Sequence, residues 1–154
     1  MATLREDIKT YSIWLVKAFK TDKLKLDYSF NSFKDIDFFF DNNSQGGKAI
    51  PDGRLSQNLG PILFAIGSYI GETFVRNIRG SEWLTDENNA EGEVTAAVIF
   101  PDGSQIWPMQ KVVKRFQNGG DDSLYDYAII LTKEYARSPV AETSAEKKPW
   151  WKFW

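Results

Sequence analysis

Glu72 is the charged residue with the most unusual surroundings in the sequence. It follows Gly67-x-x-x-Gly71 within a long apolar segment. Two glycines four residues apart give a helix a flat stripe on which another element can pack closely. A carboxylate on such a helix needs a partner or stays protonated. Lys114 and Arg115 are the expected partners, because their helix must pack nearby in a small domain. We expect a structural ion pair, with a ligand-binding or general-base carboxylate as the alternative.

A second group of chemically capable residues is the basic run Lys111, Lys114 and Arg115, which is followed by Asn118-Gly119-Gly120-Asp121-Asp122. Cations in the last turn of a short helix complement the helix dipole. The same cations are suited to bind a phosphate or an acidic protein surface. Both interpretations stay open at this stage.

A third group is the acidic segment Asp86, Glu87, Glu91 and Glu93. A run of charges in a turn is typical of a solvated sheet edge, which it protects from pairing with other strands. Binding of a cation or of a basic partner is the alternative. Neither this segment nor Asp121-Asp122 has the D-x-D-x-D-G-x5-E spacing of a calcium loop, so we expect no metal site.

The chain contains no cysteine and no histidine among its 154 residues. This excludes disulfides, thiolate nucleophiles and zinc fingers, and also Ser-His-Asp catalysis. Carboxylate, lysine and oxygen-ligand chemistry remain. The sequence therefore favours a protein that is not an enzyme, with no cofactor.

Charge and hydropathy point to a cytoplasmic protein. The 19 Lys and Arg residues against 21 Asp and Glu give a net charge of −2, and no basic stripe is available to neutralise nucleic-acid phosphates. Residues 1–20 mix charged and apolar side chains, unlike a signal peptide. The longest apolar stretch, residues 59–70, contains Gly60, Pro61 and Gly67 and is too short to cross a bilayer.

The end of the chain, Lys147-Lys148-Pro149-Trp150-Trp151-Lys152-Phe153-Trp154, is rich in aromatic and basic residues. Residues 137–149 are mostly small and polar and are predicted to be a linker. Three hypotheses follow for Trp150, Trp151, Phe153 and Trp154. They bind a partner's groove, insert at a membrane interface, or cover an apolar patch of their own domain.

Periodicity predicts the elements that must position these residues. The T-x-x-E pattern at Thr3 is a capping box that starts a helix over about 4–20, and Ser32 is the expected N-cap of a short helix that ends at Asn42-Asn43. Further expectations are a loop over 44–54, a buried helix over about 55–78, strands at 81–85, 93–100 and 105–107, a helix from Pro108, and a last helix capped by Ser123. The fold class is therefore α+β: a single domain over 1–136, with a small antiparallel sheet (a hairpin at about 93–107) packed by N-terminal and C-terminal helices.

Several of these segments also resemble an uncharacterised family of small bacterial proteins. The resemblance lies in Ser32-Phe33-Lys34-Asp35-Ile36-Asp37, Gly71-Glu72-Thr73, Trp83, Pro108 with Lys114-Arg115, and Gly120-Asp121-Asp122-Ser123-Leu124. It covers roughly residues 30 to 130 and not the tail. Some members are similar to immunity proteins, and this implies a cytoplasmic inhibitor that acts by binding.

These observations favour a non-catalytic, cytoplasmic protein-binding module, immunity-like in its narrower form. Another protein is the expected partner, with no nucleic acid; the sequence says nothing of the oligomeric state. One alternative is a small enzyme or ligand-binding protein that uses Glu72 with Lys114 or Arg115. Another is peripheral attachment to a membrane surface through the aromatic tail.

Overall fold

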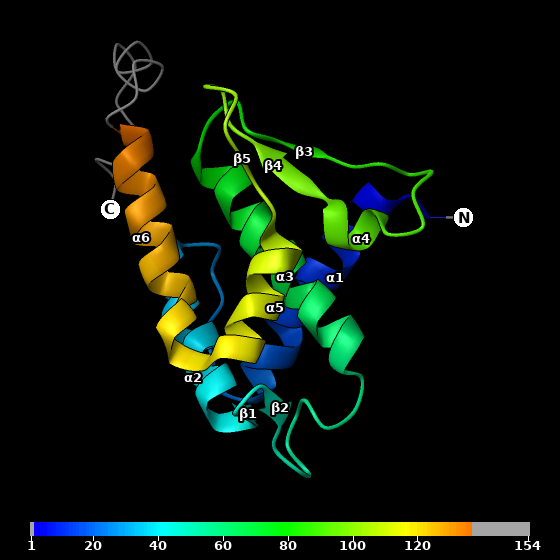
Figure 1. The fold of residues 1–154 in the computed structure, drawn as a ribbon, viewed down its shortest axis with the longest axis vertical. Helices are drawn as coiled ribbons and strands as arrows, with labels where there is room; N and C mark the ends of the chain where they lie inside the picture. Colours follow the sequence, from blue (N-terminus) through cyan, green and yellow to red (C-terminus); the bar gives the residue numbers. More distant parts are fainter. Residues whose placement is uncertain (1, 137–154) are drawn as a thin grey trace.

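The computed structural model describes residues 2–136, which form an α+β fold (Figure 1). Within these residues the α-helices are α1 (Leu4–Thr21), α2 (Phe33–Asn43), α3 (Leu59–Asn77), α4 (Gly92–Thr95), α5 (Pro108–Asn118) and α6 (Leu124–Ala136). Two 3₁₀ turns, η1 (Phe30–Ser32) and η2 (Gly119–Asp122), precede α2 and α6. The strands are β1 (Ser44–Gln45), β2 (Lys48–Ala49), β3 (Glu82–Leu84), β4 (Ala97–Ile99) and β5 (Gln105–Ile106). They form antiparallel sheets of order β1-β2 and β3-β4-β5, so the predicted fold class is confirmed.

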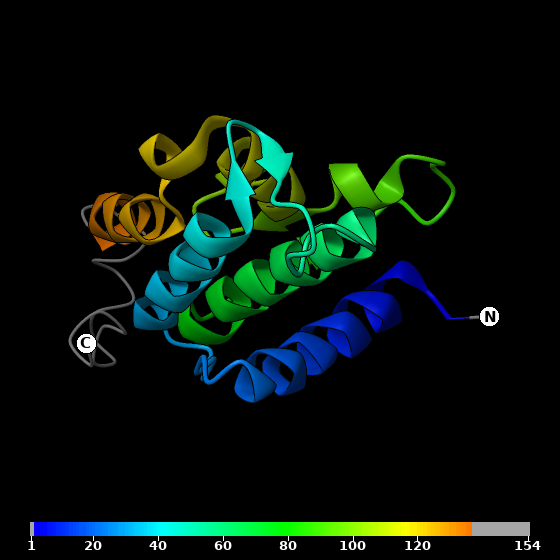
Figure 2. The same cartoon turned by 90° about the horizontal axis from the view of Figure 1, so that it is seen from below.

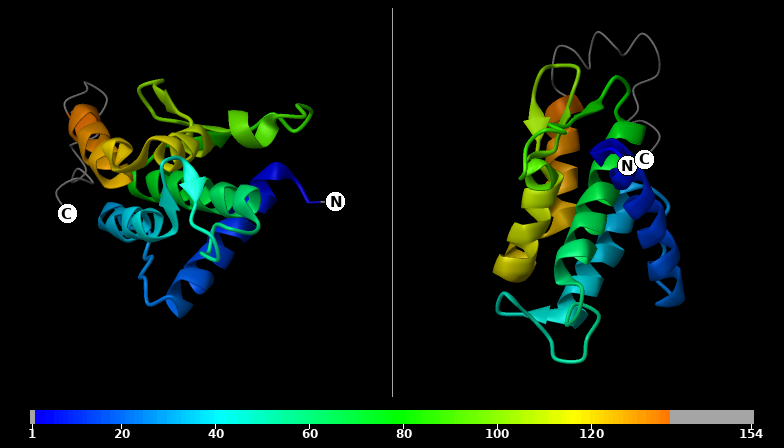
Figure 3. Two further views of the ribbon diagram at one scale, coloured as in Figure 1. Left: turned by 60° about the horizontal axis from the view of Figure 1, so that its bottom comes forward. Right: turned by 90° about the vertical axis from the view of Figure 1, so that its right-hand side faces the viewer.

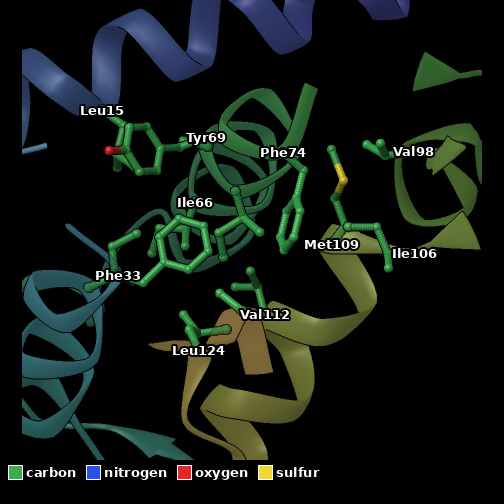
Figure 4. Close-up of a cluster of buried hydrophobic side chains, with 14 of the residues drawn as sticks. Leu15, Phe33, Ile66, Tyr69, Phe74, Val98, Ile106, Met109, Val112 and Leu124 are labelled. Carbon is green, nitrogen blue, oxygen red and sulfur yellow. The ribbon is translucent and has the colours of Figure 1, made fainter. Parts of the chain in front are cut away.

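Helix α3 is the centre of the fold, and every residue from Phe64 to Phe74 is buried. Figure 2 shows α1 along one side of α3 and the α5 layer along the other. The core side chains lie in the same layers (Figure 4). Leu15 of α1 is beside Tyr69 of α3, and Met109 of α5 and Val98 of β4 are beside Phe74 of α3. A helix that is apolar all round is expected to be central, and the structure confirms this.

The three-stranded sheet packs one face on α3. Trp83, Val98 and Ile106 are in register across the strands and buried. Because side chains alternate along a strand, Leu84 and Ile99 belong to the opposite face. The predicted turn at residues 101–104 is confirmed by the hydrogen bond from the Phe100 amide to the Ser104 carbonyl.

The strand predicted over 93–100 is wrong for its first residues, because α4 occupies Gly92–Thr95. The side-chain amide of Gln110 donates to the backbone carbonyl of Val94. The backbone of Gly92 packs against the carbonyl of Asp86. These tertiary contacts hold a helical turn despite the β-branched composition.

The N-terminal half contains three further corrections and one confirmation. The capping box of Thr3 and Glu6 is present. Ser32 stands at the predicted N-cap position of α2, but it has helical backbone angles and its side chain makes no cap hydrogen bond, whereas Ser29 caps the turn before it. The helix predicted from residue 55 begins at Leu59, because Asn58 is left-handed (φ +58°) and ends the preceding loop. The predicted loop over 44–54 contains the short β1-β2 hairpin.

The two glycines of the α3 motif permit close packing. A Cβ at Gly67 would lie 2.9 Å from the Cα of Met109 on α5, and one at Gly71 would lie 2.1 Å from the ring of Trp83 on β3. No Cβ fits at these distances, so α5 and β3 rest on the backbone of α3. The motif therefore serves packing within the domain.

Substitution of Gly71 with alanine is expected to lower the free energy of unfolding by about 3 kcal/mol, because the indole ring must move away from α3. The measurement is urea denaturation. Gly120→Ala is the control, since its Cβ would meet nothing within 4 Å; it is expected to change stability by less than about 0.5 kcal/mol. Equal effects of the two substitutions would contradict the close-packing account.

Candidate functional site

The predicted pairing of Glu72 with Lys114 or Arg115 is wrong. Glu72 is 8% exposed and its carboxylate accepts a hydrogen bond of 3.0 Å from the indole nitrogen of Trp83. Arg76, one turn further along α3, lies 3.8 Å from its other oxygen. The flat surface at Gly71 brings the indole this close, so the carboxylate finds its donor on β3. Within the described residues, both partners of the Glu72 carboxylate, Trp83 and Arg76, belong to the packing of the domain.

Arg115 is instead the buried cation of the fold, with 1% of its surface exposed. Its guanidinium donates to the Asp37 carboxylate at 2.9 Å and to the Asp41 carboxylate at 2.8 Å. It also donates to the backbone carbonyl of Asp37 at 3.1 Å. A buried charge needs such partners, because it is costly to desolvate alone. Arg115 therefore joins α5 to α2.

Asp37 also holds the beginning of α6. Its carboxylate accepts hydrogen bonds from the amides of Leu124 and Tyr125 and from the hydroxyl of Ser123. Ser123 in turn accepts from the amide of Asp126, which confirms it as the cap of this helix. A negative charge at a helix N-terminus is stabilised by the free amides. One carboxylate thus connects three helices.

The basic run on α5 is divided between structural and exposed roles. Lys111 pairs with Asp122 at 3.1 Å, and Lys114 is exposed. Hydrogen bonds from Asn118 and then from Lys111 lower the pKa of the Asp122 carboxyl. Because Lys111 and Arg115 already have carboxylate partners, the run is not gathered around an anion site in the described residues.

Replacing Asp37 with asparagine is expected to lower the free energy of unfolding by about 3 kcal/mol, because the buried guanidinium loses a charged partner and α6 loses part of its cap. Asp41→Asn is the matched control. The Asp41 side chain is 64% exposed, so less than about 1 kcal/mol is expected there. Urea denaturation measures both, and similar losses would show that Asp37 has no special role.

The acidic segment contributes to the fold through Glu87. Both of its carboxylate oxygens accept from the amide of Leu4, at 3.0 and 2.9 Å. Arg5 lies nearby and donates to the carbonyl of Trp83. The part of the chain that the structure describes has no group of three or more acidic residues placed to hold a metal ion.

A polar network fixes the connector between α1 and α2. The hydroxyl of Tyr69 accepts from the amide of Tyr28 at 2.8 Å and shares a hydrogen bond of 2.6 Å with Ser32. Burial raises the pKa of Tyr69 to about 12. Burial alone raises the pKa of Tyr127, on α6, to about 12 as well.

Stability is expected to fall between about pH 10 and pH 12. The unfolded chain ionises these phenols near pH 10, whereas the folded chain keeps them neutral until about pH 12, so the unfolded state gains over this window. Tyr127→Phe is expected to recover about 1–2 kcal/mol of the loss near pH 12, after allowing for partial exposure of the ring. Denaturation at pH 8 and pH 11.5 tests this, and an unchanged difference between the two pH values in the variant would contradict it.

A groove of about 1120 Å³ lies between α1, the loop after β2 and the first turn of α3. Its wall on α1 is formed by Tyr11, Trp14 and Ala18, and Pro61 and Ile62 line the α3 side. The indole of Trp14 is 48% exposed. The groove is therefore an apolar trough with an accessible aromatic side chain.

The rim of the groove is polar. Asp22 and Arg54 form an ion pair across it. Asp52 and Asn58 line it with left-handed backbone angles, φ +63° and +58°. Aspartate and asparagine are the residues other than glycine that adopt such angles most readily, so these positions are typical of tight turns in the loop. Gln57 and Asn58, which carry side-chain amides, are exposed and line the groove.

The groove does not follow from the sequence patterns. Trp14 lies at the edge of the apolar stripe of the first helix, and residues 55–58 are predicted to be helical. The available signal was an indole at the outer margin of that stripe. The aromatic tail, Trp150 to Trp154, and the linker lie outside the described residues.

Comparison with protein-family models, with curated proteins and with solved structures gives no match for this chain. Among residues 2–136, no helix is both long and apolar enough to cross a membrane.

Proposed function

We propose that this chain is a non-catalytic protein-binding module that acts in the cytoplasm and takes a segment of another protein into the α1 groove. The observation that carries the proposal is the half-exposed indole of Trp14 beside an apolar trough. Tryptophan is among the residues that contribute most to protein interfaces when a partner covers them. Its exposure in the free domain leaves apolar area available for that purpose.

The rim indicates the chemistry of the partner. Asp52 is exposed and has no ion pair within the described residues, whereas Asp22 is paired with Arg54. The amides of Gln57 and Asn58 are suited to pair with a peptide backbone. The preferred ligand is therefore an extended segment with a large apolar side chain next to a lysine or arginine.

The family resemblance in the sequence supports a narrower form of the same proposal. In that form the partner is a toxin that the chain inhibits by binding. The groove supports binding in general, and the resemblance supports this choice of partner.

Trp14→Ala is expected to weaken partner binding at least about tenfold, because the variant loses a large, half-exposed aromatic side chain that the partner covers. The partner is captured from a lysate of the native organism, identified and purified, and its Kd is measured for wild type and variant. Phe38→Ala is the matched control, since Phe38 is 57% exposed on α2 and does not line the groove.

Three results would contradict the proposal. A Kd unchanged by Trp14→Ala would remove the groove as the binding site. Equal losses in the Trp14 and Phe38 variants would indicate nonspecific aromatic adsorption. A melting temperature that falls markedly in the Trp14 variant would indicate a packing role for this side chain.

A further inference from the structure

The face of the β3-β4-β5 sheet opposite α3 is a second exposed apolar surface. Leu84 is 38% exposed and Trp107 is 45% exposed. Leu84 on β3 lies opposite Ala97 on β4. Trp107 is one residue beyond β5, and the register of β4 and β5 places it opposite Ala97 from the other side. Ile99 belongs to the same face. We call Leu84, Ile99 and Trp107 the outer sheet face.

No helix of residues 2–136 covers the outer sheet face. Figure 1 shows α3 behind the sheet and α4 and α5 beyond its lower end, and the right-hand view of Figure 3 shows α1 and α3 together on one side of it. Leu84 and Trp107 flank Ala97 on this face, and Ile99 follows two residues along β4. An indole, a leucine and an isoleucine so close together on a bare sheet form an exposed apolar patch that another segment can cover.

The described chain ends beside this sheet. The ring of Tyr135, in the last turn of α6, packs against Phe100 with centroids 6.0 Å apart. Phe100 directly follows β4 and, like Val98, is buried on the α3 side of the sheet. The described chain therefore ends on that side, beside the end of the sheet where the turn at residues 101–104 lies.

The linker is long enough to reach across this face. Residues 137–149 are thirteen residues, and a chain of this length can span at most about 45 Å. Glu82 lies opposite Ile99, at the end of the sheet nearer to Phe100. Asp86, at the far edge, is four residues further along the chain, which is about 13 Å in an extended strand. The far edge of the sheet thus lies within the reach of residues 147–154.

The charges at that far edge complement the tail. The segment after β3 and the adjacent α4 carry exposed carboxylates, namely Asp86, Glu87, Glu91 and Glu93. Arg5 lies beside this segment, where its guanidinium donates to the hydroxyl of Thr85 and to the carbonyl of Trp83. Residues 147–154 contain three lysines, four large aromatic residues and no acid. An apolar patch with an acidic border matches aromatic residues interspersed with lysines.

We infer that residues 147–154 dock on the outer sheet face of their own domain, with aromatic side chains over Leu84, Ile99 and Trp107 and with lysines beside the acidic edge. The α1 groove offers fewer carboxylates. It also lies toward the end of the molecule that carries β1 and β2, whereas α6 ends at the opposite end (Figure 1). The inference does not depend on the proposed function, because it concerns a different surface.

The first experiment is carbodiimide coupling of the full chain at micromolar concentration. The reagent condenses a lysine amine with a carboxylate in contact with it, with loss of water. Mass spectrometry of the monomer is expected to find Lys147, Lys148 or Lys152 joined to residues 82–93. The yield is expected to fall about tenfold when Trp150, Trp151, Phe153 and Trp154 are all changed to serine, because the lysines are then no longer held there.

Several outcomes would overturn the inference. Coupling found only in a dimer band would identify a second copy as the occupant. Coupling to Asp22 or Asp52 would place the tail in the α1 groove. Absence of tail coupling, together with flotation of the full chain on vesicles that contain anionic lipid, would identify a membrane surface. An unchanged yield in the tail variant would show that the aromatic residues do not hold the tail.

A stability comparison provides an independent readout. Trp107→Ser is expected to lower the melting temperature by about 3 °C more in the full chain than in the four-serine tail variant, because only the full chain loses the contact with the tail. Phe38→Ser, at an exposed site away from the sheet, is expected to have the same effect in both backgrounds. Equal effects of Trp107→Ser in both backgrounds would also overturn the inference.

Discussion

The close approach of the α5 backbone and of the Trp83 indole to the backbone of α3 is the constraint on which the rest of the structure depends. At Gly67 and Gly71 the helix has no side chain, so α5 and β3 contact its backbone directly. Any larger residue would push these elements outward, and the buried face of the sheet would lose its contact with the core. The position of Trp83 follows from this contact, and so does its hydrogen bond to Glu72.

The second half of the chain is joined to the first by charge. Arg115 and Asp37 make their contacts where α2, α5 and the start of α6 meet. Apolar packing alone leaves the orientation of a short helix loosely specified, whereas a guanidinium with fixed donor directions defines it. The outer sheet face and the α1 wall of the groove lie on other elements, namely β3-β4-β5 and α1.

The fold class, the central helix and most helix starts could be predicted because they follow from local patterns. The capping box at Thr3 and the proline at the start of α5 act on neighbouring residues. Prediction failed where distant residues decide. The partner of Arg115 is 78 residues away on α2, and Gln110 helps to hold the α4 turn in place of a strand. The groove was missed for the same reason, since α1 and the loop after β2 meet only in the folded chain.

The contact between Glu87 and the amide of Leu4 connects residues 83 positions apart. It completes the cap of the first helix with a side chain synthesised much later. At ribosomal rates of about 5–20 residues per second, roughly 4–17 s separate the two residues. During synthesis, therefore, α1 leaves the ribosome with its capping box but without this partner. The N-terminal turn acquires its final set of hydrogen bonds only when β3 and the acidic segment have emerged and packed beside it.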